Sequence, residues 1–277
     1  MTEVLFTGER LSPGSALFGV DLERHRAAYA HAIRNARGER LLDLGCGTGY
    51  GTAELADALG PRIRVFGLDR VRPARASLRP NARYLRGDLH GIPLAARQFD
   101  TITSFQVIEH LEEPTAYLRA IARLLRPDGC AYITTPNILT SDGVNPWHVH
   151  EYEAGELETT LREHFADVVM LGVSAGPAVA PYFEERLARI RKIMRIDPLG
   201  LRNLLPASAI DWLFAKFALV VRRGIEDDAG LPTATLDDFP IRPADVSDLD
   251  LLAVCRGPRE ETPMSPRGRA IAAQNSW

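Results

Sequence analysis

The sequence has few cysteines and no strong excess of charge of either sign. Its three cysteines, Cys46, Cys130 and Cys255, are far apart and odd in number, and none belongs to a Cys-x-x-Cys pair. We therefore expect neither a disulfide framework nor a structural zinc site, and we expect a reducing, cytoplasmic location. The formal net charge is only -3, so the chain lacks the basic excess that is typical of nucleic-acid-binding proteins.

Long apolar runs are also missing. The most apolar stretch, Trp212–Val221, has about ten residues and contains Lys216, whereas a helix that spans a membrane needs about 20. The N-terminus lacks the basic start and the apolar core of a signal peptide. With 45% hydrophobic and 25% charged residues among 277, the composition is ordinary for a globular protein. We expect a chain without a transmembrane segment, whose partners are small molecules and not nucleic acids.

Apolar segments of strand length alternate with helical segments over the first two thirds of the chain. Strands are predicted at residues 40–45, 62–69, 82–88, 101–105 and 130–137. Helices of amphipathic spacing lie between most of them, and such alternation predicts a parallel sheet with helices on both faces. The fold class is therefore α/β, and we expect further strands near residues 167–174 and 248–257.

The alternation defines a division of the chain. We expect an N-terminal cap segment at residues 1–38 and a ligand-binding core made of residues 39–174 and 246–257. Between the two core pieces, residues 175–245 form a proline-containing, arginine-rich helical insertion, which could be a substrate lid, a homodimer interface or a surface for an amphiphilic glycan. The polar residues 258–277 are expected to be a disordered tail.

The glycine-rich stretch LLDLGCGTGYG, residues 41–51, follows the first predicted strand. Ligands of open parallel sheets bind at the carboxyl ends of the strands, where this loop lies. A dinucleotide-binding loop would read Gly-x-Gly-x-x-Gly, but Tyr50 takes the place of the third glycine. Asp43, just before the loop, would repel a pyrophosphate and attract an ammonium group. The loop therefore favours S-adenosylmethionine (SAM), which carries an amino-acid cation, over a dinucleotide.

Two more acidic residues end the next two strands. Asp69 ends the second strand, where a carboxylate can bind ribose hydroxyls, and Asp88 ends the third, where it could accept a hydrogen bond from an adenine amine. Each acid alone could be a solvated turn residue or a helix cap. Three acids at three successive strand ends, with glycines at the first, favour a nucleoside ligand.

These motifs together resemble those of class I SAM-dependent methyltransferases. The stretch LLDLGCGTGYG resembles motif I, VFGLD motif II, GDLHGIPL the adenine-side motif, and residues 99–137 the region that follows. The resemblance covers about residues 39–173 and the strand near 248–255. It implies a Rossmann-like, seven-stranded mixed sheet whose final strand is antiparallel, with SAM as the cofactor. The cofactor-binding residues that it implies, together with their close neighbours, are Asp43, Gly45, Cys46, Gly47, Thr48, Gly49, Asp69, Arg70, Asp88, Leu89 and Gln106.

Candidates for the chemistry follow the fourth and fifth strands. Methyl transfer needs the acceptor held in line with the methyl group, and it can need a base to remove the acceptor's proton. Glu109 and His110, at the start of the helix expected after strand four, and His148 and His150 in the next loop are the candidate catalytic residues. Glu109, His110 and a loop histidine, His150 in our prediction, could bind Mg²⁺. The same residues could instead form a general base, or they could be a helix cap and a solvated loop.

The resemblance also bears on the acceptor. Ubiquinone-pathway O-methyltransferases and small-RNA 2′-O-methyltransferases have Glu-x-x-Glu-His at this place and bind a metal there, but Gln106 replaces the first glutamate here. The N-terminal segment resembles that of bacterial sugar and glycan O-methyltransferases, in which it closes over the cofactor. Arg10, Arg24, His25 and Tyr29 are therefore candidates for contact with SAM or substrate.

We expect a methyltransferase that acts on a hydroxyl of a sugar, a glycan or another small molecule. An N- or C-methyltransferase of a small metabolite is the first alternative, and a non-catalytic SAM-binding protein is the second.

Overall fold

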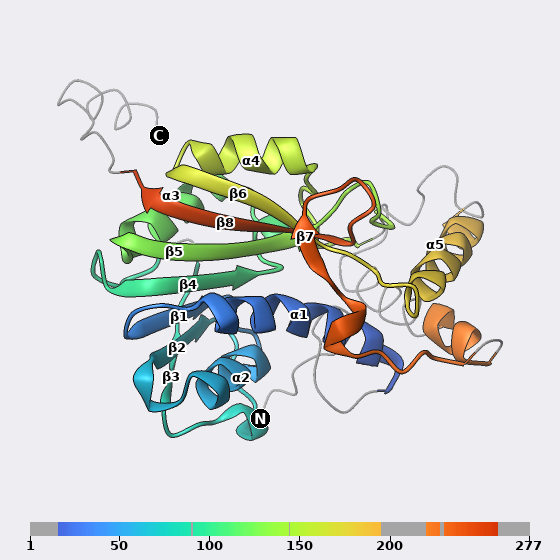
Figure 1. Ribbon diagram of the computed structural model, residues 1–277, viewed down its shortest axis with the longest axis horizontal. Helices are drawn as coiled ribbons and strands as arrows, with labels where there is room; N and C mark the ends of the chain where they lie inside the picture. Colours follow the sequence, from blue (N-terminus) through green and yellow to red (C-terminus); the bar gives the residue numbers. More distant parts are fainter. Residues whose placement is uncertain (1–15, 90, 144, 195–219, 228–229, 260–277) are drawn as a thin grey trace, which may run out of the picture.

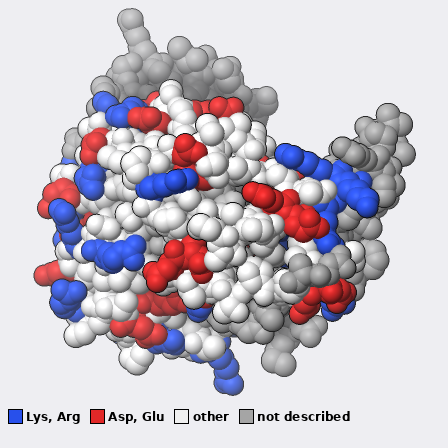
Figure 2. Space-filling model, turned by 45° about the vertical axis from the view of Figure 1, so that its right-hand side comes forward, with Lys and Arg blue, Asp and Glu red and all other residues white. Residues whose placement is uncertain are grey.

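The computed structural model describes residues 16–89, 91–143, 145–194, 220–227 and 230–259. Among these residues no helix is long and apolar enough to cross a membrane. Figure 2 shows acidic and basic side chains interspersed on one face of the described part. The parts of the predictions that concern Arg10, most of the apolar stretch before Val221, and the C-terminal tail lie outside the described residues.

One mixed sheet forms the centre of the molecule (Figure 1). Its strands are β1 (Arg40–Leu44), β2 (Arg64–Asp69), β3 (Ala82–Arg86), β4 (Phe99–Phe105), β5 (Leu125–Pro136), β6 (Phe165–Val173), β7 (Ile241–Pro243) and β8 (Asp250–Pro258). They lie in the order β3-β2-β1-β4-β5-β8-β6-β7. Strands β1 to β5 pair in parallel, whereas β8 is antiparallel to both β5 and β6.

The predicted α/β class and the antiparallel final strand are confirmed. The predicted count of seven strands is one too low, because the short strand β7 inside the insertion pairs with β6 and extends the sheet to eight strands. A segment of three residues is too short to give a readable alternation of apolar and polar side chains.

Helices cover both faces of the sheet. They are α1 (Gly19–Asn35), α2 (Tyr50–Leu59), α3 (Pro114–Leu124) and α4 (Ala154–Arg162). The insertion adds α5 (Ala180–Met194) and a helical stretch at residues 220–227. Short 3-10 turns are η1 (Ala16–Phe18), η2 (Gly60–Arg62), η3 (Arg75–Ser77), η4 (Ile108–His110) and η6 (Leu236–Asp238). One apolar cluster joins α3 and α4 to one face of the sheet, and a second joins α1 and α2 to the other.

The strand β1 shows why the sheet is buried on both sides. Leu42 and Leu44 belong to the cluster under α3 and α4, whereas Leu41 packs under α1 and α2. Successive side chains of a strand point to opposite faces, so a continuous apolar run is what a doubly covered parallel strand requires.

Two predicted features of the region after β4 need correction. Glu109 and His110 do not begin a helix; they lie in the 3-10 turn η4, and α3 begins only at Pro114. The strand predicted at residues 130–137 begins earlier, since α3 ends at Leu124 and β5 starts at Leu125. A proline disfavours helical backbone at the residue before it, and the chain enters the sheet instead.

The described part of the insertion packs against α1. Tyr182 and Ile190 of α5 and Val221 of the 220–227 helix share an apolar cluster with Val20 and Ala27 of α1. In Figure 1, α5 and the 220–227 helix lie together at one end of α1, on the side to which the carboxyl ends of the parallel strands point. The insertion is therefore placed beside the edge of the sheet where ligands bind.

Candidate functional site

A cavity of about 670 Å³ opens at the carboxyl ends of the parallel strands. This volume is within the range of small-molecule sites, about 300–1,000 Å³. All the cofactor-binding residues predicted from the sequence line this cavity except Asp43 and Gly49. Glu109, His110 and His148 line it as well, so one cavity joins the glycine loop to the candidate catalytic groups.

The glycine loop requires glycine for two physical reasons. Gly45, Gly47 and Gly49 have φ angles of 75°, 54° and 84°, in the left-handed region that other residues rarely adopt. A Cβ atom at Gly45 would also overlap the side chain of Val107, which follows β4. The loop can therefore turn tightly beneath a ligand and pack against the next strand end.

Asp69 is held at the edge of the cavity. Its two carboxylate oxygens accept backbone N–H bonds from Gly47 and Val71, both at 2.8 Å. These bonds fix the carboxylate between the glycine loop and the turn after β2, which is where its counterpart in a nucleotide-binding sheet meets the ribose. Asp88 and Leu89 line the same cavity after β3.

Asp43 lies beneath the glycine loop and not in the cavity wall. It is 1% exposed and accepts hydrogen bonds from the hydroxyls of Thr52 at 2.7 Å and Thr103 at 2.8 Å. Burial raises the pKa of Asp43 to about 6, although the hydroxyl bonds oppose the rise. Asp43 does not line the cavity, so the predicted contact between its carboxylate and an ammonium group of the ligand has no support from the cavity lining. Its hydrogen bonds instead join the segment beneath the glycine loop to α2 and β4.

Gln106, which follows β4, and Arg24 of α1 both contact Asp250. Gln106 has a positive φ of 56°, and its side-chain amide donates to Asp250 at 3.2 Å. Asp250 forms an ion pair with Nε of Arg24 at 3.4 Å, but this Nε has no hydrogen-bond partner within the described part of the chain. The structure thus places a mostly buried guanidinium beside Gln106, with donors available to a ligand.

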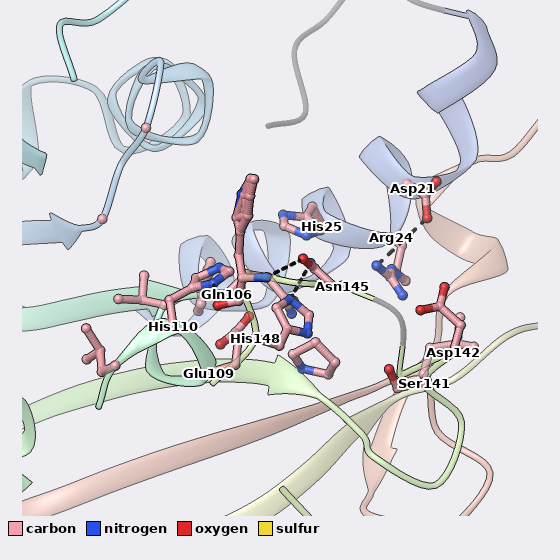
Figure 3. Close-up of a pocket in the computed structure, with 18 of the residues that line it drawn as sticks. Asp21, Arg24, His25, Gln106, Glu109, His110, Ser141, Asp142, Asn145 and His148 are labelled. Atoms are coloured by element: carbon pink, nitrogen blue, oxygen red, sulfur yellow. Dashed lines mark hydrogen bonds and ion pairs between the residues drawn. The ribbon is translucent and has the colours of Figure 1, made fainter. Parts of the chain in front are cut away.

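A second cluster lies across the cavity. One ligand atom each from Glu109, His110 and His148 lies within 4.8 Å of the others (Figure 3). Glu109 is fully buried; its Oε2 accepts a bond from the Thr135 hydroxyl at 3.1 Å, and its Oε1 has no partner in the described residues. Burial raises the pKa of Glu109 to about 8. An unpartnered carboxylate oxygen in such a place is costly unless a proton or a cation satisfies it.

The two histidines are oriented by their neighbours. Nδ1 of His110 lies 3.0 Å from the Trp147 carbonyl, which can only accept, so this nitrogen carries the proton and Nε2 keeps its lone pair. Nδ1 of His148 lies against the carboxylate of Glu151, and its Nε2 is 2.8 Å from the Asn145 amide. A ring N–H bound to a carbonyl or carboxylate is the usual support of a metal-binding histidine.

His150 does not join this cluster, which corrects its prediction as a catalytic residue and metal ligand. Its Nε2 lies 2.7 Å from Glu156, its ring packs on Tyr152, and about half of its side chain is exposed. The N–H groups of Val149 and His150 both bind the carbonyl of Glu109, which ties this loop to the turn η4, and the side chain of His148 lines the cavity whereas that of His150 does not. His148 lies beside Glu109 and His110, in the place that the sequence predicts for His150 as the third metal ligand.

Sequence reasoning missed several residues of the cavity. Asp21 of α1 accepts hydrogen bonds at 2.8 Å from Arg186 of α5 and from Arg222 of the 220–227 helix. Asn145 and Asp142, in the loop after β5, also line the cavity. No local motif marks these residues, because their partners are far away in the chain. Glu151 could have been found from the sequence, because an acid three positions after His148 can reach the same imidazole.

An open sheet of this strand order, with a glycine loop and acids at successive strand ends, defines a class I SAM-dependent methyltransferase. A family model described as "Methyltransferase domain" matches residues 21–222. The chain belongs to this methyltransferase family.

Similar proteins agree with this assignment. The chain is 33% identical over 267 residues to a probable S-adenosylmethionine-dependent methyltransferase of Mycolicibacterium smegmatis, covering 91% of this chain and 95% of that protein. A ubiquinone biosynthesis O-methyltransferase of Xanthomonas oryzae is 34% identical over 118 residues, 40% of this chain and 49% of that protein. A methyltransferase of Haloferax volcanii, solved with its Trm112 activator, has the same fold, with a TM-score of 0.52 and 20% identity over 87% of this chain and 92% of that one.

Proposed function

We propose that this SAM-dependent enzyme transfers a methyl group to a hydroxyl of a sugar, a glycan or another small molecule. The observation that carries the proposal is the shared cavity, in which Glu109, His110 and His148 face the glycine loop. An oxygen acceptor must lose a proton when it attacks the methyl group, and a cluster of imidazoles and a carboxylate can assist that loss. An amine acceptor needs less assistance, so N-methylation uses this cluster less well.

The proposed position of SAM follows from the lining of the cavity. Asp69 would bind the ribose hydroxyls, and Asp88 with Leu89 would face the adenine. The methionine end would then lie near Gln106, where Arg24 supplies a guanidinium to its carboxylate. A charge-assisted bond of this kind is stronger than a neutral one. The arrangement directs the sulfonium methyl toward the Glu109 side of the cavity.

A divalent cation such as Mg²⁺ fits the cluster of Glu109, His110 and His148. The fit rests on the unpartnered Oε1 of Glu109 and on the two histidines whose ring N–H groups are already engaged. A bound cation would lower the pKa of an acceptor hydroxyl and so ease its deprotonation. Thr135 holds the Glu109 carboxylate in place, and Glu151 fixes the tautomer of His148.

The chain's own groups can also move the proton. Nδ1 of His148 is paired with Glu151, so Nε2 is the nitrogen that can take a proton, in exchange for the bond that it makes with the Asn145 amide at 2.8 Å. As the acceptor oxygen forms its bond to the methyl carbon, the carbon–sulfur bond breaks and S-adenosylhomocysteine leaves as a neutral thioether. The hydroxyl proton passes to His148, and the imidazolium is stabilised by the Glu151 carboxylate.

The insertion supports the proposal as a lid on the acceptor side, next to a core of residues 39–174 and 246–257. Its helix α5 contributes Phe183, Arg186, Leu187 and Ile190 to the cavity wall. These side chains would exclude water from the transferring methyl group. A cytoplasmic location is in keeping with cysteines that are all free thiols, and a homodimer stays a prediction.

Three measurements test the proposal. Isothermal titration should show binding of SAM and S-adenosylhomocysteine, and no heat for either would overturn the cofactor assignment. Release of S-adenosylhomocysteine should be detected with hydroxyl acceptors from a panel of sugars, phenols and amines; turnover with amines alone would support the N-methyl alternative. Titration of Mn²⁺ followed by electron paramagnetic resonance should show a site that Glu109→Gln removes, while a site unchanged in that variant would exclude the cluster.

A further inference from the structure

The acceptor side of the cavity contains an oppositely charged pair that the methyl-transfer chemistry does not use. Asp142, in the loop after β5, and Arg186, on α5, both line the cavity. Nη2 of Arg186 lies 3.6 Å from Oδ2 of Asp142, and the two side chains are 19% and 20% exposed. At this separation the two groups form an ion pair without a hydrogen bond between them.

Arg186 is held in position by a buried carboxylate on the side away from Asp142. Its Nη1 donates to the buried carboxylate of Asp21 at 2.8 Å, while Arg222 binds the other oxygen of the same carboxylate. Burial alone would raise the pKa of Asp21, but the surrounding arginines hold it well below its usual range. Asp21 is therefore ionised, and it fixes the guanidinium of Arg186 so that Nη2 is the end nearest Asp142.

The charges of this wall balance. The positive charges are those of Arg24, Arg186 and Arg222. Their ion-pair partners Asp21, Asp142 and Asp250 carry three negative charges. An anionic ligand would meet Asp142 with like charge, and a cationic ligand would meet the arginines. A neutral ligand with several hydroxyls avoids both penalties, because each hydroxyl can donate to a carboxylate and accept from a guanidinium.

The other side chains of the wall suit the same kind of ligand. Asn145 lines the cavity with an amide that bonds His148 and accepts from the Trp147 backbone N–H, and Trp147 contributes a half-buried indole. An indole offers a broad apolar face with a single N–H at its edge. Figure 3 shows Glu109, His110 and His148 grouped on one side of the view and Asp21, Arg24 and Asp142 on the other. A ligand can thus be held at Asp142 and modified at the histidines.

We propose that Asp142 and Arg186 together bind two neighbouring hydroxyls of an uncharged sugar ring, and that they select such acceptors over anionic and aromatic ones. The Asp142 carboxylate accepts from one hydroxyl and the Arg186 guanidinium donates to the other. A further hydroxyl of the sugar then reaches the Glu109 cluster. This inference rests on the proposed methyl transfer to oxygen and names the acceptor class of that site.

The test uses the full chain loaded with S-adenosylhomocysteine and saturation-transfer NMR. The probes are the methyl glycosides of glucose, mannose and galactose, the corresponding uronic acids, and catechol. We expect at least one neutral glycoside to bind and each uronic acid to bind about tenfold more weakly, because it places a carboxylate near Asp142. Tighter binding of a uronic acid or of catechol than of every neutral glycoside would overturn the proposal.

Asp142→Ala is the variant of choice. A substitution of Arg186 is avoided, because Arg186 also binds the buried Asp21 and its loss could unfold the insertion. Asp142→Ala should weaken the glycoside at least about tenfold, since a site built around a substrate hydroxyl loses most when the bond is lost. Its affinity for S-adenosylhomocysteine and its melting temperature should not change. The control is Arg189→Gln, one turn further along α5, where Arg189 pairs with Glu185 and does not line the cavity. Equal affinity for the glycoside in Asp142→Ala and the wild type would overturn the proposal.

Different results would contradict the proposed methyl transfer and the proposed sugar-binding role. A wild-type protein that does not bind S-adenosylhomocysteine contradicts the proposed function itself. A wild-type protein that binds it and methylates a phenol, but shows no response to any neutral glycoside, contradicts only the sugar-binding role of Asp142 and Arg186.

Discussion

The imidazole Nδ1 of His148 lies against the carboxylate of Glu151, three residues further along the same loop. This contact fixes which ring nitrogen carries the proton and leaves the other as the acceptor of the Asn145 amide, in the wall of the cavity. Burial opposes the charge of Glu151, but the hydrogen bonds from His148 and Ser141 outweigh it and lower the pKa of this carboxyl below its usual value. Glu151 is therefore ionised at neutral pH and can orient the imidazole.

Replacing Glu151 by glutamine should reduce both cation affinity and turnover. Loss of such a supporting carboxylate typically costs about 10- to 100-fold in metal affinity or activity. The measurements are Mn²⁺ titration and the rate of S-adenosylhomocysteine release under saturating SAM. Glu153→Gln is the matched control, because this residue is exposed and makes no side-chain cap bond to α4. Equal rates for the two variants would remove Glu151 from the mechanism.

The raised pKa of Glu109, about 8, predicts a pH dependence of stability in the cation-free protein. The folded state holds a proton on Glu109 between its ordinary pKa of 4.5 and about 8, whereas the unfolded chain releases it. The contribution of Glu109 to the free energy of unfolding should therefore be greatest below pH 4.5 and should fall as the pH rises toward 8. The effect is on the order of a few kcal/mol, because each pKa unit corresponds to about 1.4 kcal/mol.

Chemical denaturation at several pH values, with and without Mg²⁺, measures this effect. Glu109→Gln should flatten the decline in the cation-free protein, since glutamine does not titrate. Mg²⁺ should reduce the decline in the wild type, because a cation stabilises the carboxylate form. An unchanged slope in the variant would show that another group titrates.

Removing the guanidinium of Arg24 should weaken binding of the amino-acid part of the cofactor. Arg24→Gln is expected to lower affinity for S-adenosylhomocysteine by about tenfold to a hundredfold, the value of a hydrogen bond to a charged group. Affinity for methylthioadenosine, which lacks the amino acid, should not change. Arg26→Gln is the control, because Arg26 pairs with Glu23 and Glu54 and does not line the cavity. Parallel losses for both ligands would assign Arg24 to the fold and not to the carboxylate.

The geometry of the glycine loop predicts a strong effect of Gly45→Ala. The residue has a φ of 75°, and an added Cβ would overlap Val107. We expect a loss of about 1–3 kcal/mol of stability, which is the usual cost of such backbone strain. SAM binding should become undetectable by calorimetry. Gly155→Ala in α4 has nothing within 4 Å of the added atom and should leave both properties unchanged. Wild-type affinity in Gly45→Ala would mean that the loop does not contact the cofactor.

Asp21 is expected to hold the insertion in place. Asp21→Asn would leave Arg186 and Arg222 without their buried carboxylate, and breaking a buried ion pair from one side costs about 3–5 kcal/mol. Hydrogen exchange should become faster in α5 and in residues 220–227, with less change in β1 and β4. The exposed Asp237→Asn serves as the control. Uniform loss of protection over the whole sheet would indicate global destabilisation and not release of the insertion.

Local patterns were enough to predict the class of fold and the cofactor. The glycines at 45, 47 and 49 and the acids Asp69 and Asp88 lie within short segments, and each is tied to the end of one strand. The parallel arrangement of the strands then brings these ends together without further information. The alternation predicted the parallel sheet and the resemblance predicted the antiparallel final strand, whereas the order of the strands and the short strand β7 came only from the structure.

The acceptor side could not be predicted in this way. Asp21, Asp142, Arg186 and Arg222 come from four separate segments, and only folding brings them to one wall. His148 and His150 are indistinguishable in the sequence, since both are loop histidines two residues apart. Their tertiary contacts differ, because His148 pairs with Glu151 and Asn145 whereas His150 pairs with Glu156. The sequence by itself determined the cofactor loop because its constraints are local, while the tertiary structure alone decided the acceptor wall because its contacts join distant segments.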